Sequence, residues 1–248
     1  MSVRDKTVAM HGFQQERGYE RATSPSPRGR LHDGVQQFMN GVYLWMAAGV
    51  AITGVVAWGI STRPAILQAV WGSSLGMILS LGTFVLAIAL QRMIPTMNRG
   101  TAAAGFFGYS AAMGVVLSYI PVFYPVGNIA AVMAATVGMF AVMGLIGFVT
   151  KKDLSGMGQF FVMGLLGAII ASVVNGFFIQ SASMSMGISA LIALVSAGLT
   201  AYYTQAIKQM YRTHGGRGNL AVLGALVLYI NFINLFLSLL RLFGGSRE

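Results

Sequence analysis

Four polar side chains interrupt the last apolar stretch of the chain, Asn219–Phe243, and could do chemistry inside a membrane. They are Asn231, Asn234, Ser238 and Arg241, and their spacing puts them on one stripe of a helix. With a rise of about 1.5 Å per residue, this helix could cross a hydrocarbon core of roughly 30 Å. A carboxamide that faces lipid costs on the order of several kcal/mol. We therefore predict that other helices surround this last segment and that it is central.

A second polar face lies on the sixth apolar stretch, where Ser and Thr recur at helical intervals and are followed by Tyr203. Hydroxyls and amides can bind water or coordinate a cation weakly, but they supply no fixed charge. The sequence leaves open whether they are hydrogen-bonding contacts between helices or the lining of a solute path. It predicts no metal site and no cofactor. The predicted polar interior comprises Ser172, Asn175, Ser196, Thr200, Asn234 and Ser238.

The acidic residues and the histidines all lie outside the apolar stretches. Proton-coupled pumps and many cation transporters use a carboxylate or His within the membrane, and this chain has neither there. It also has no Cys, and no nucleophile is paired with a base, so we predict that it is not an enzyme. The residues concerned are Asp5, Glu16, Glu20, Asp33, Asp153, Glu248, His11, His32 and His214.

The composition is that of a polytopic membrane protein. Of the 248 residues 56% are hydrophobic and 9% charged, whereas soluble domains carry about 25% charged residues. The net charge of +10 reflects few acids and basic residues in connections. We expect the lipid bilayer to be the main partner and exclude nucleic acid.

Seven apolar stretches predict an all-α bundle of seven transmembrane helices over residues 39–248. The connections are short, so neighbouring helices should be antiparallel. Residues 1–38 mix charges with Pro, Ser and Gly and should form a mobile tail. The stretches are Met39–Ile60, Ser74–Leu90, Thr101–Ile120, Asn128–Val149, Met157–Ile179, Met184–Ile207 and Asn219–Phe243.

Basic residues gather in alternate connections, on the same side as the N-terminal tail. The positive-inside rule then predicts a cytoplasmic N-terminus and a C-terminus on the opposite side. Arg241 and Arg247 run against this assignment, and a last segment that re-enters the membrane and returns would accommodate them.

Small residues recur at four-residue spacing, which favours close approach of helix backbones. The three series are Ala104, Gly108 and Ala112; Ser110, Gly114 and Ser118; and Gly164, Ala168 and Ser172.

Three stretches, Thr150–Phe178, Ala197–Tyr211 and Leu223–Gly244, resemble the bacterial branch of the Bax inhibitor family. The resemblance implies a seven-helix bundle in the bacterial inner membrane with helix seven in the middle. It also implies a pH-sensitive calcium leak and, for some bacterial relatives, modulation of a membrane-anchored protease.

The chain departs from the family at two positions. Tyr203 and Asn231 stand where the family has two aspartates that share protons and sense pH. Neither a phenol, with a reference pKa of about 10, nor a carboxamide titrates near neutrality. If the sixth helix continues to about Arg212, these two residues reach a similar depth, and we expect them to form a hydrogen bond.

Two functions remain open. One is a calcium-leak pathway that has lost its acidic gate, with weak calcium binding at most. The other is a non-transporting partner or modulator of another membrane protein, such as a membrane protease.

Overall fold

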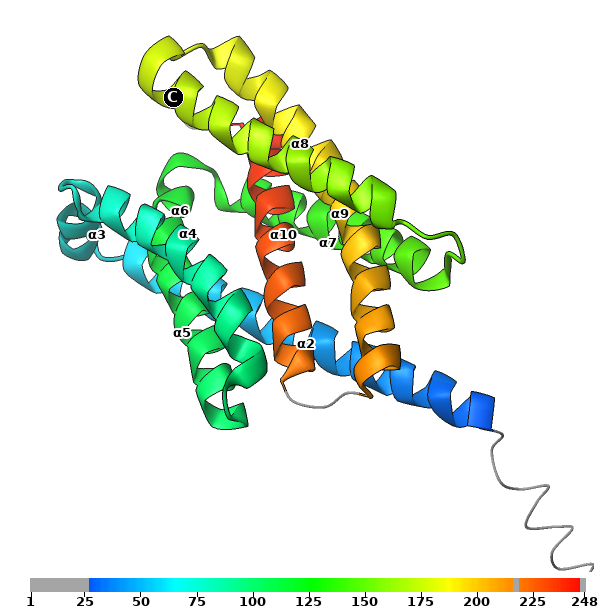
Figure 1. Cartoon of the computed structure of the whole chain (residues 1–248). Coiled ribbons are helices and arrows are strands. Elements are labelled where there is room, and N and C mark those ends of the chain that lie inside the picture. The colour runs from blue at the N-terminus through cyan, green and yellow to red at the C-terminus, as the bar shows by residue number, and fades with distance from the viewer. Residues whose placement is uncertain (1–26, 216–218, 246–248) are drawn as a thin grey trace, which may run out of the picture. The chain divides into compact units, whose positions relative to one another are not determined.

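The computed structural model describes residues 27–215 and 219–245, and its regular elements there are all helices (Figure 1). Short helical turns link several of the long helices. The elements are α2 (Pro27–Ser61), α3 (Pro64–Trp71), α4 (Leu75–Met93), η1 (Ile94–Thr96), α5 (Arg99–Val116), η2 (Leu117–Tyr119), α6 (Ile120–Phe123), α7 (Val126–Val149), α8 (Ser155–Val174), the π-helical turn η3 (Asn175–Ile179), α9 (Ala182–His214) and α10 (Leu220–Phe243).

The chain divides into two units, Met1–Gln37 and Phe38–Glu248. In the first unit, the described residues 27–37 are helical and form the first turns of α2, so this helix begins at Pro27 rather than at Met39. The rest of the predicted tail, residues 1–26, lies outside the described residues. The second unit holds all the other elements described here.

Within the described ranges, seven helical segments are long and apolar enough to cross a membrane, which confirms the predicted all-α bundle. Their predicted and observed ends differ by a few residues in most cases. The sixth helix continues to His214, where Gly215 closes it with a positive φ of 65°. The segments are Asp33–Ser61, Leu75–Thr96, Arg99–Phe123, Val126–Val149, Ser155–Ile179, Ala182–His214 and Leu220–Phe243.

Helix α10 is the central helix of the bundle, as its polar stripe predicts. In its most apolar window 61% of the residues are buried, compared with 11% in Ser155–Ile179. It packs against α9, α7, α4 and α5, and Figure 1 shows these helices around it. Helix α9 continues beyond the predicted stretch, which ends at Ile207, to His214, and it is the most extensive neighbour of α10.

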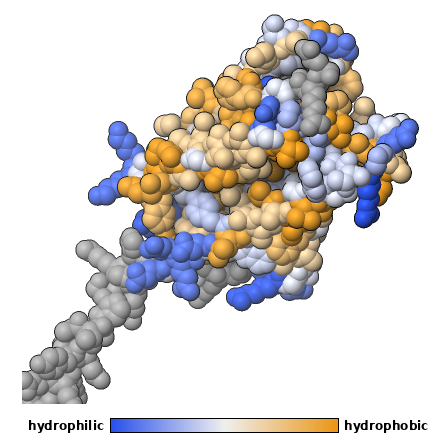
Figure 2. All heavy atoms as spheres, turned by 180° about the vertical axis from the view of Figure 1, so that it is seen from behind, coloured by the Kyte–Doolittle hydropathy of each residue, from blue (hydrophilic) through white to orange (hydrophobic). Residues whose placement is uncertain are grey.

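The outer surface of the bundle is apolar. Hydrophobic side chains cover much of the face in Figure 2, and several large ones are more than two thirds exposed, including Val55, Phe160, Leu194 and Phe178. In a bilayer the acyl chains cover such a surface, so its exposure is the expected arrangement for membrane-spanning helices.

Two of the close helix contacts depend on glycine. A Cβ atom on Gly114 of α5 would lie 2.7 Å from the Val56 Cβ and 2.8 Å from the Thr53 carbonyl oxygen of α2. A Cβ on Gly147 of α7 would overlap the Ala201 backbone of α9. Gly108, in another of the four-residue series, has open space beside it. The four-residue spacing of small residues therefore identifies the contact at Gly114, misses the one at Gly147 and wrongly suggests one at Gly108.

Side chains of α9 hold the end of α7 and the connection to α8. Gln205 donates to the Lys152 carbonyl at 2.8 Å and accepts from the Leu154 N–H at 2.9 Å. The Lys208 ammonium, which is 8% exposed, donates to the Phe148 carbonyl at the end of α7. A cation at a helix C-terminus binds a free carbonyl and interacts favourably with the negative end of the helix dipole. The sixth and fourth spans are thus locked together at this end.

Candidate functional site

Asn231 is buried at the centre of the bundle and bonds α10 to α9. It is 2% exposed, and its amide nitrogen donates to the Ser196 carbonyl and to the Thr200 hydroxyl oxygen, each at 2.9 Å. The Thr200 hydroxyl donates in turn to the Ser196 carbonyl. Both protons of the amide are therefore used, and the contact needs no titrating group.

The carbonyl oxygen of Asn231 has no hydrogen-bond partner among the described residues. The hydroxyl oxygens of Ser172, Ser189 and Ser196 are also buried without one. An unsatisfied buried acceptor costs on the order of 1–3 kcal/mol, so such groups usually bind water or a solute.

A cavity of about 60 Å³ lies against Asn231. It has room for about two water molecules at roughly 30 Å³ each. Helices α4, α8, α9 and α10 all contribute to its wall, so four of the seven spans meet there. The lining residues are Gln91, Leu165, Tyr203, Val227, Ile230, Asn231 and Asn234.

Tyr203 and Asn231 therefore line the same cavity, as their predicted depth suggests, but the predicted hydrogen bond between them is wrong. The Asn231 amide nitrogen is bound to α9 backbone and to Thr200, and its oxygen has no partner in the described residues. The Thr200 hydroxyl, and not the Tyr203 phenol, is therefore the side-chain hydrogen-bond partner of the Asn231 amide.

The rest of the predicted polar interior divides into four groups, of which the first is Ser172 of α8, whose buried hydroxyl oxygen has no partner among the described residues. Ser196, Thr200 and Asn234 lie at the site, through the Asn231 hydrogen bonds or in the cavity wall. Ser238 is buried, but its hydroxyl bonds the Asn234 carbonyl of its own helix. Back-bonding of this kind satisfies a hydroxyl locally, so Ser238 has no remaining proton to donate to the cavity.

Asn175 belongs to a different structure, the turn between α8 and α9. Its amide donates to the Ser185 hydroxyl at 2.7 Å and to the Ser181 carbonyl at 3.1 Å, and its oxygen accepts from the Ser181 N–H. These bonds close the π-helical turn, where Gln180 has a positive φ of 52°. Its placement in the central polar interior is therefore wrong, because all its hydrogen-bonding groups serve the turn.

Sequence reasoning missed an exposed polar residue at the cavity and two polar residues of the core. Gln91 lies in the cavity wall, although its position near the end of a span suggested a connection. Thr53 and Tyr229 share a hydrogen bond of 2.6 Å between α2 and α10, and Thr53 also donates toward the Ser110 carbonyl of α5. A single Thr in an apolar stretch shows no periodic spacing of polar residues, so the contact between Thr53 and Tyr229 could be found only from the packing of the helices.

The site offers neutral oxygen atoms and no charge. Among residues 27–215 and 219–245, no three His, Cys, Asp or Glu side chains come together as a metal site. Calcium prefers six to eight oxygen ligands with carboxylates among them. The phenol, amides and hydroxyls at this cavity could bind water or give weak, transient contacts to a cation.

Comparisons with known proteins agree with this architecture. The family profile described as "Inhibitor of apoptosis-promoting Bax1" matches residues 35–248. "Inner membrane protein YbhL" of Escherichia coli (strain K12) is 38% identical over 220 residues, 86% of this chain and 94% of that protein. An uncharacterized protein of Caulobacter vibrioides is 35% identical over 247 residues, 94% of this chain and 98% of that one. With seven described apolar helices, of which α10 is the central one, and a profile match over most of its length, the chain belongs to the Bax inhibitor family of multi-pass membrane proteins.

Proposed function

We propose that this protein is a calcium-leak-type member of its family, in the bacterial inner membrane, whose central gate is neutral and does not respond to pH. The observation that carries the proposal is the unpaired, buried carbonyl oxygen of Asn231 beside the cavity that Tyr203 also lines. The inner-membrane location is supported by the name of the Escherichia coli relative.

The unpaired oxygen supports a hydrated site at the middle of the central helix. A buried acceptor is stabilised by water, and the cavity has the volume for it. Passage of calcium would require α8, α9 and α10 to move apart and widen this space. Because the Asn231 amide is bonded to α9 at any pH near neutrality, we expect this opening to be rare and the flux to be low.

The small cavity also favours the second candidate, a protein that transports nothing and acts by binding another membrane protein, such as a membrane protease. A volume of about 60 Å³ accommodates water more readily than a calcium ion with its hydration shell. The same neutral site would then serve only to hold the bundle together.

Filling the cavity distinguishes the two candidates. Leu165 lines the cavity, whereas its neighbour Leu166 is 50% exposed on the outer surface. In proteoliposomes loaded with a calcium-sensitive dye, Leu165→Phe should reduce the flux severalfold, because the larger ring blocks the path. Leu166→Phe should leave it unchanged. A wild-type flux equal to that of protein-free liposomes would exclude the leak and favour the interaction role.

We further propose that the N-terminal end of α2 and the residues before it lie on the cytoplasmic side, together with the α4–α5 and α7–α8 connections. The distribution of basic residues supports this orientation. The chain has no Cys, so Arg99→Cys and Lys151→Cys each introduce a unique thiol. In intact cells both should resist an impermeant maleimide, whereas Arg63→Cys, on the opposite side, should react. Labelling of Arg99→Cys or Lys151→Cys from outside would reverse the topology.

A further inference from the structure

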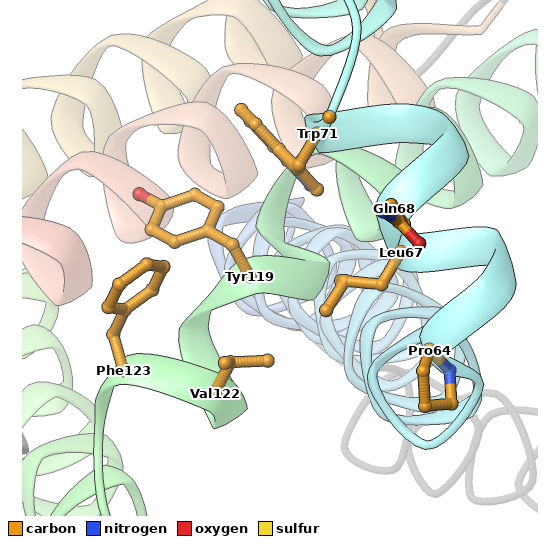
Figure 3. A pocket seen from close by; sticks show the side chains of 8 residues that line it. Pro64, Leu67, Gln68, Trp71, Tyr119, Val122 and Phe123 are labelled. Carbon is orange, nitrogen blue, oxygen red and sulfur yellow. The ribbon is translucent and has the colours of Figure 1, made fainter.

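A pocket of about 620 Å³ lies away from the central site, between α3 and the segment formed by η2 and α6 (Figure 3). This volume falls within the range of about 300–1,000 Å³ that is usual for ligand pockets. Its wall is mostly apolar and aromatic. The lining residues are Pro64, Leu67, Gln68, Trp71, Gly72, Tyr119, Val122 and Phe123.

The aromatic wall of the pocket is fixed by its own contacts. The Trp71 ring nitrogen donates to the Ser118 hydroxyl at 3.3 Å, and the Trp71 and Tyr119 rings meet edge to face with 5.1 Å between centroids. Gly76 of α4 packs directly on the Trp71 ring, since a Cβ there would lie 2.7 Å from it. Figure 3 shows Pro64, Leu67 and Trp71 extending from α3 on one side of the space and Tyr119, Val122 and Phe123 from η2 and α6 on the other. The pocket is therefore held open by interactions that do not need a ligand.

Two arginines lie next to residues of the pocket wall. Arg63 immediately precedes Pro64 in the wall, and the Arg241 guanidinium of α10 lies beside the Tyr119 hydroxyl. Both arginines are exposed. In the described segments 61–74, 117–127 and 241–245, these arginines are the only charged residues. An apolar pocket with two guanidinium groups beside its wall complements an occupant with a hydrocarbon part and an anionic part.

We propose that this pocket binds an anionic phospholipid, with an acyl chain against Leu67, Trp71 and Phe123 and the phosphate group on Arg63 and Arg241. Trp and Tyr are the aromatic residues that gather at the interface between membrane and water, where a headgroup and the first part of its chain lie together. Arginine binds phosphate through paired N–H groups, and anionic headgroups attract basic residues at the membrane surface. The proposal is independent of calcium flux and of the gate at Asn231.

Quenching of Trp71 fluorescence by brominated lipids tests the proposal. Trp45→Phe with Trp58→Phe leaves Trp71 as the single tryptophan of three. This protein is placed in phosphatidylcholine bilayers that contain small, increasing fractions of brominated phosphatidylglycerol or brominated phosphatidylcholine. We expect half-maximal quenching at a roughly 25-fold lower fraction of the anionic lipid, about fivefold for each of the two arginines. Each arginine near a membrane surface contributes about 1 kcal/mol, so Arg63→Gln and Arg241→Gln should each shift the midpoint about fivefold.

Two further variants assign the effect to the pocket. Arg99→Gln removes an exposed arginine at the start of α5, remote in sequence from the pocket, and should leave the midpoint unchanged. Leu67→Phe reduces the pocket volume and should weaken quenching by the anionic lipid at an unchanged melting temperature. Equal quenching by the two lipids would overturn the proposal. So would a preference for the anionic lipid that survives in the double variant Arg63→Gln with Arg241→Gln, or quenching by the anionic lipid that is unchanged in Leu67→Phe. Loss of the preference in inorganic phosphate at constant ionic strength would assign the arginines to a free anion instead of a lipid.

Discussion

Replacing Tyr203 and Asn231 together by aspartate is expected to make both stability and calcium flux depend on pH between about pH 5 and 8. Both residues line the same cavity, in which Asn231 is buried and Tyr203 is partly buried. Burial and a neighbouring carboxylate each raise the pKa of a carboxyl group, so at least one of the new groups should hold its proton in the native state at a pH where the unfolded chain has released it.

The sign of the stability effect follows from this linkage. A carboxyl group whose native pKa is raised contributes full stability below its unfolded pKa of about 3.9, and this stability is lost as the pH rises through the native pKa. Each unit of difference corresponds to about 1.4 kcal/mol. The double variant should therefore melt at a lower temperature in detergent at pH 8 than at pH 5, and its flux should change over the same range.

A matched control separates charge from shape. Tyr203→Asn places a small polar side chain at the same position without a carboxyl group, so its melting temperature and flux should stay flat with pH. A double aspartate variant as insensitive to pH as Tyr203→Asn would mean that the two positions do not form a coupled pair.

Replacing Gly147 by alanine is expected to destabilise the protein by about 1–3 kcal/mol, the usual range for overpacking in a close-packed interior. The added methyl would overlap the Ala201 backbone of α9, with the Ala201 Cα only 2.7 Å away. Backbone atoms cannot rotate away as a side chain can, so α7 and α9 would have to separate. The higher helix propensity of alanine, worth up to about 1 kcal/mol, opposes only part of this effect.

Gly138→Ala on the same helix is the control, because nothing lies within 4 Å of a Cβ there. It should be neutral or slightly stabilising in a thermal melt in detergent. If Gly147→Ala has the same melting temperature as Gly138→Ala, the close contact of α7 with α9 is wrong.

The seven spans and the central last helix could be predicted from the sequence, because both follow from hydrophobicity and from the cost of polar groups in lipid. The stripe of Asn231 and Asn234 placed α10 inside the bundle before any packing was known. The end of α9 was predicted less closely, since the apolar stretch ends at Ile207, a continuation to about Arg212 was only a condition, and the helix reaches His214.

The details of the site could not be predicted, because they depend on which of several polar neighbours a side chain meets. Asn175 has helical spacing to Ser172 but bonds Ser181 and Ser185 in its own turn. The Asn231 amide had both Tyr203 and Thr200 within plausible reach, and packing selected Thr200. Helix α3 was missed because eight residues between two spans are too few to give a clear period.

The most direct test of the neutral gate is the calcium flux of the unaltered protein in proteoliposomes, measured at closely spaced pH values from 5 to 8 under a constant calcium gradient. A site of phenol, carboxamide and hydroxyl groups has nothing that titrates in this range by reference values. The flux should therefore be low and nearly constant. A flux that changes steeply between pH 6 and 8 would contradict the account and would require another titrating group, such as His214, to control the path.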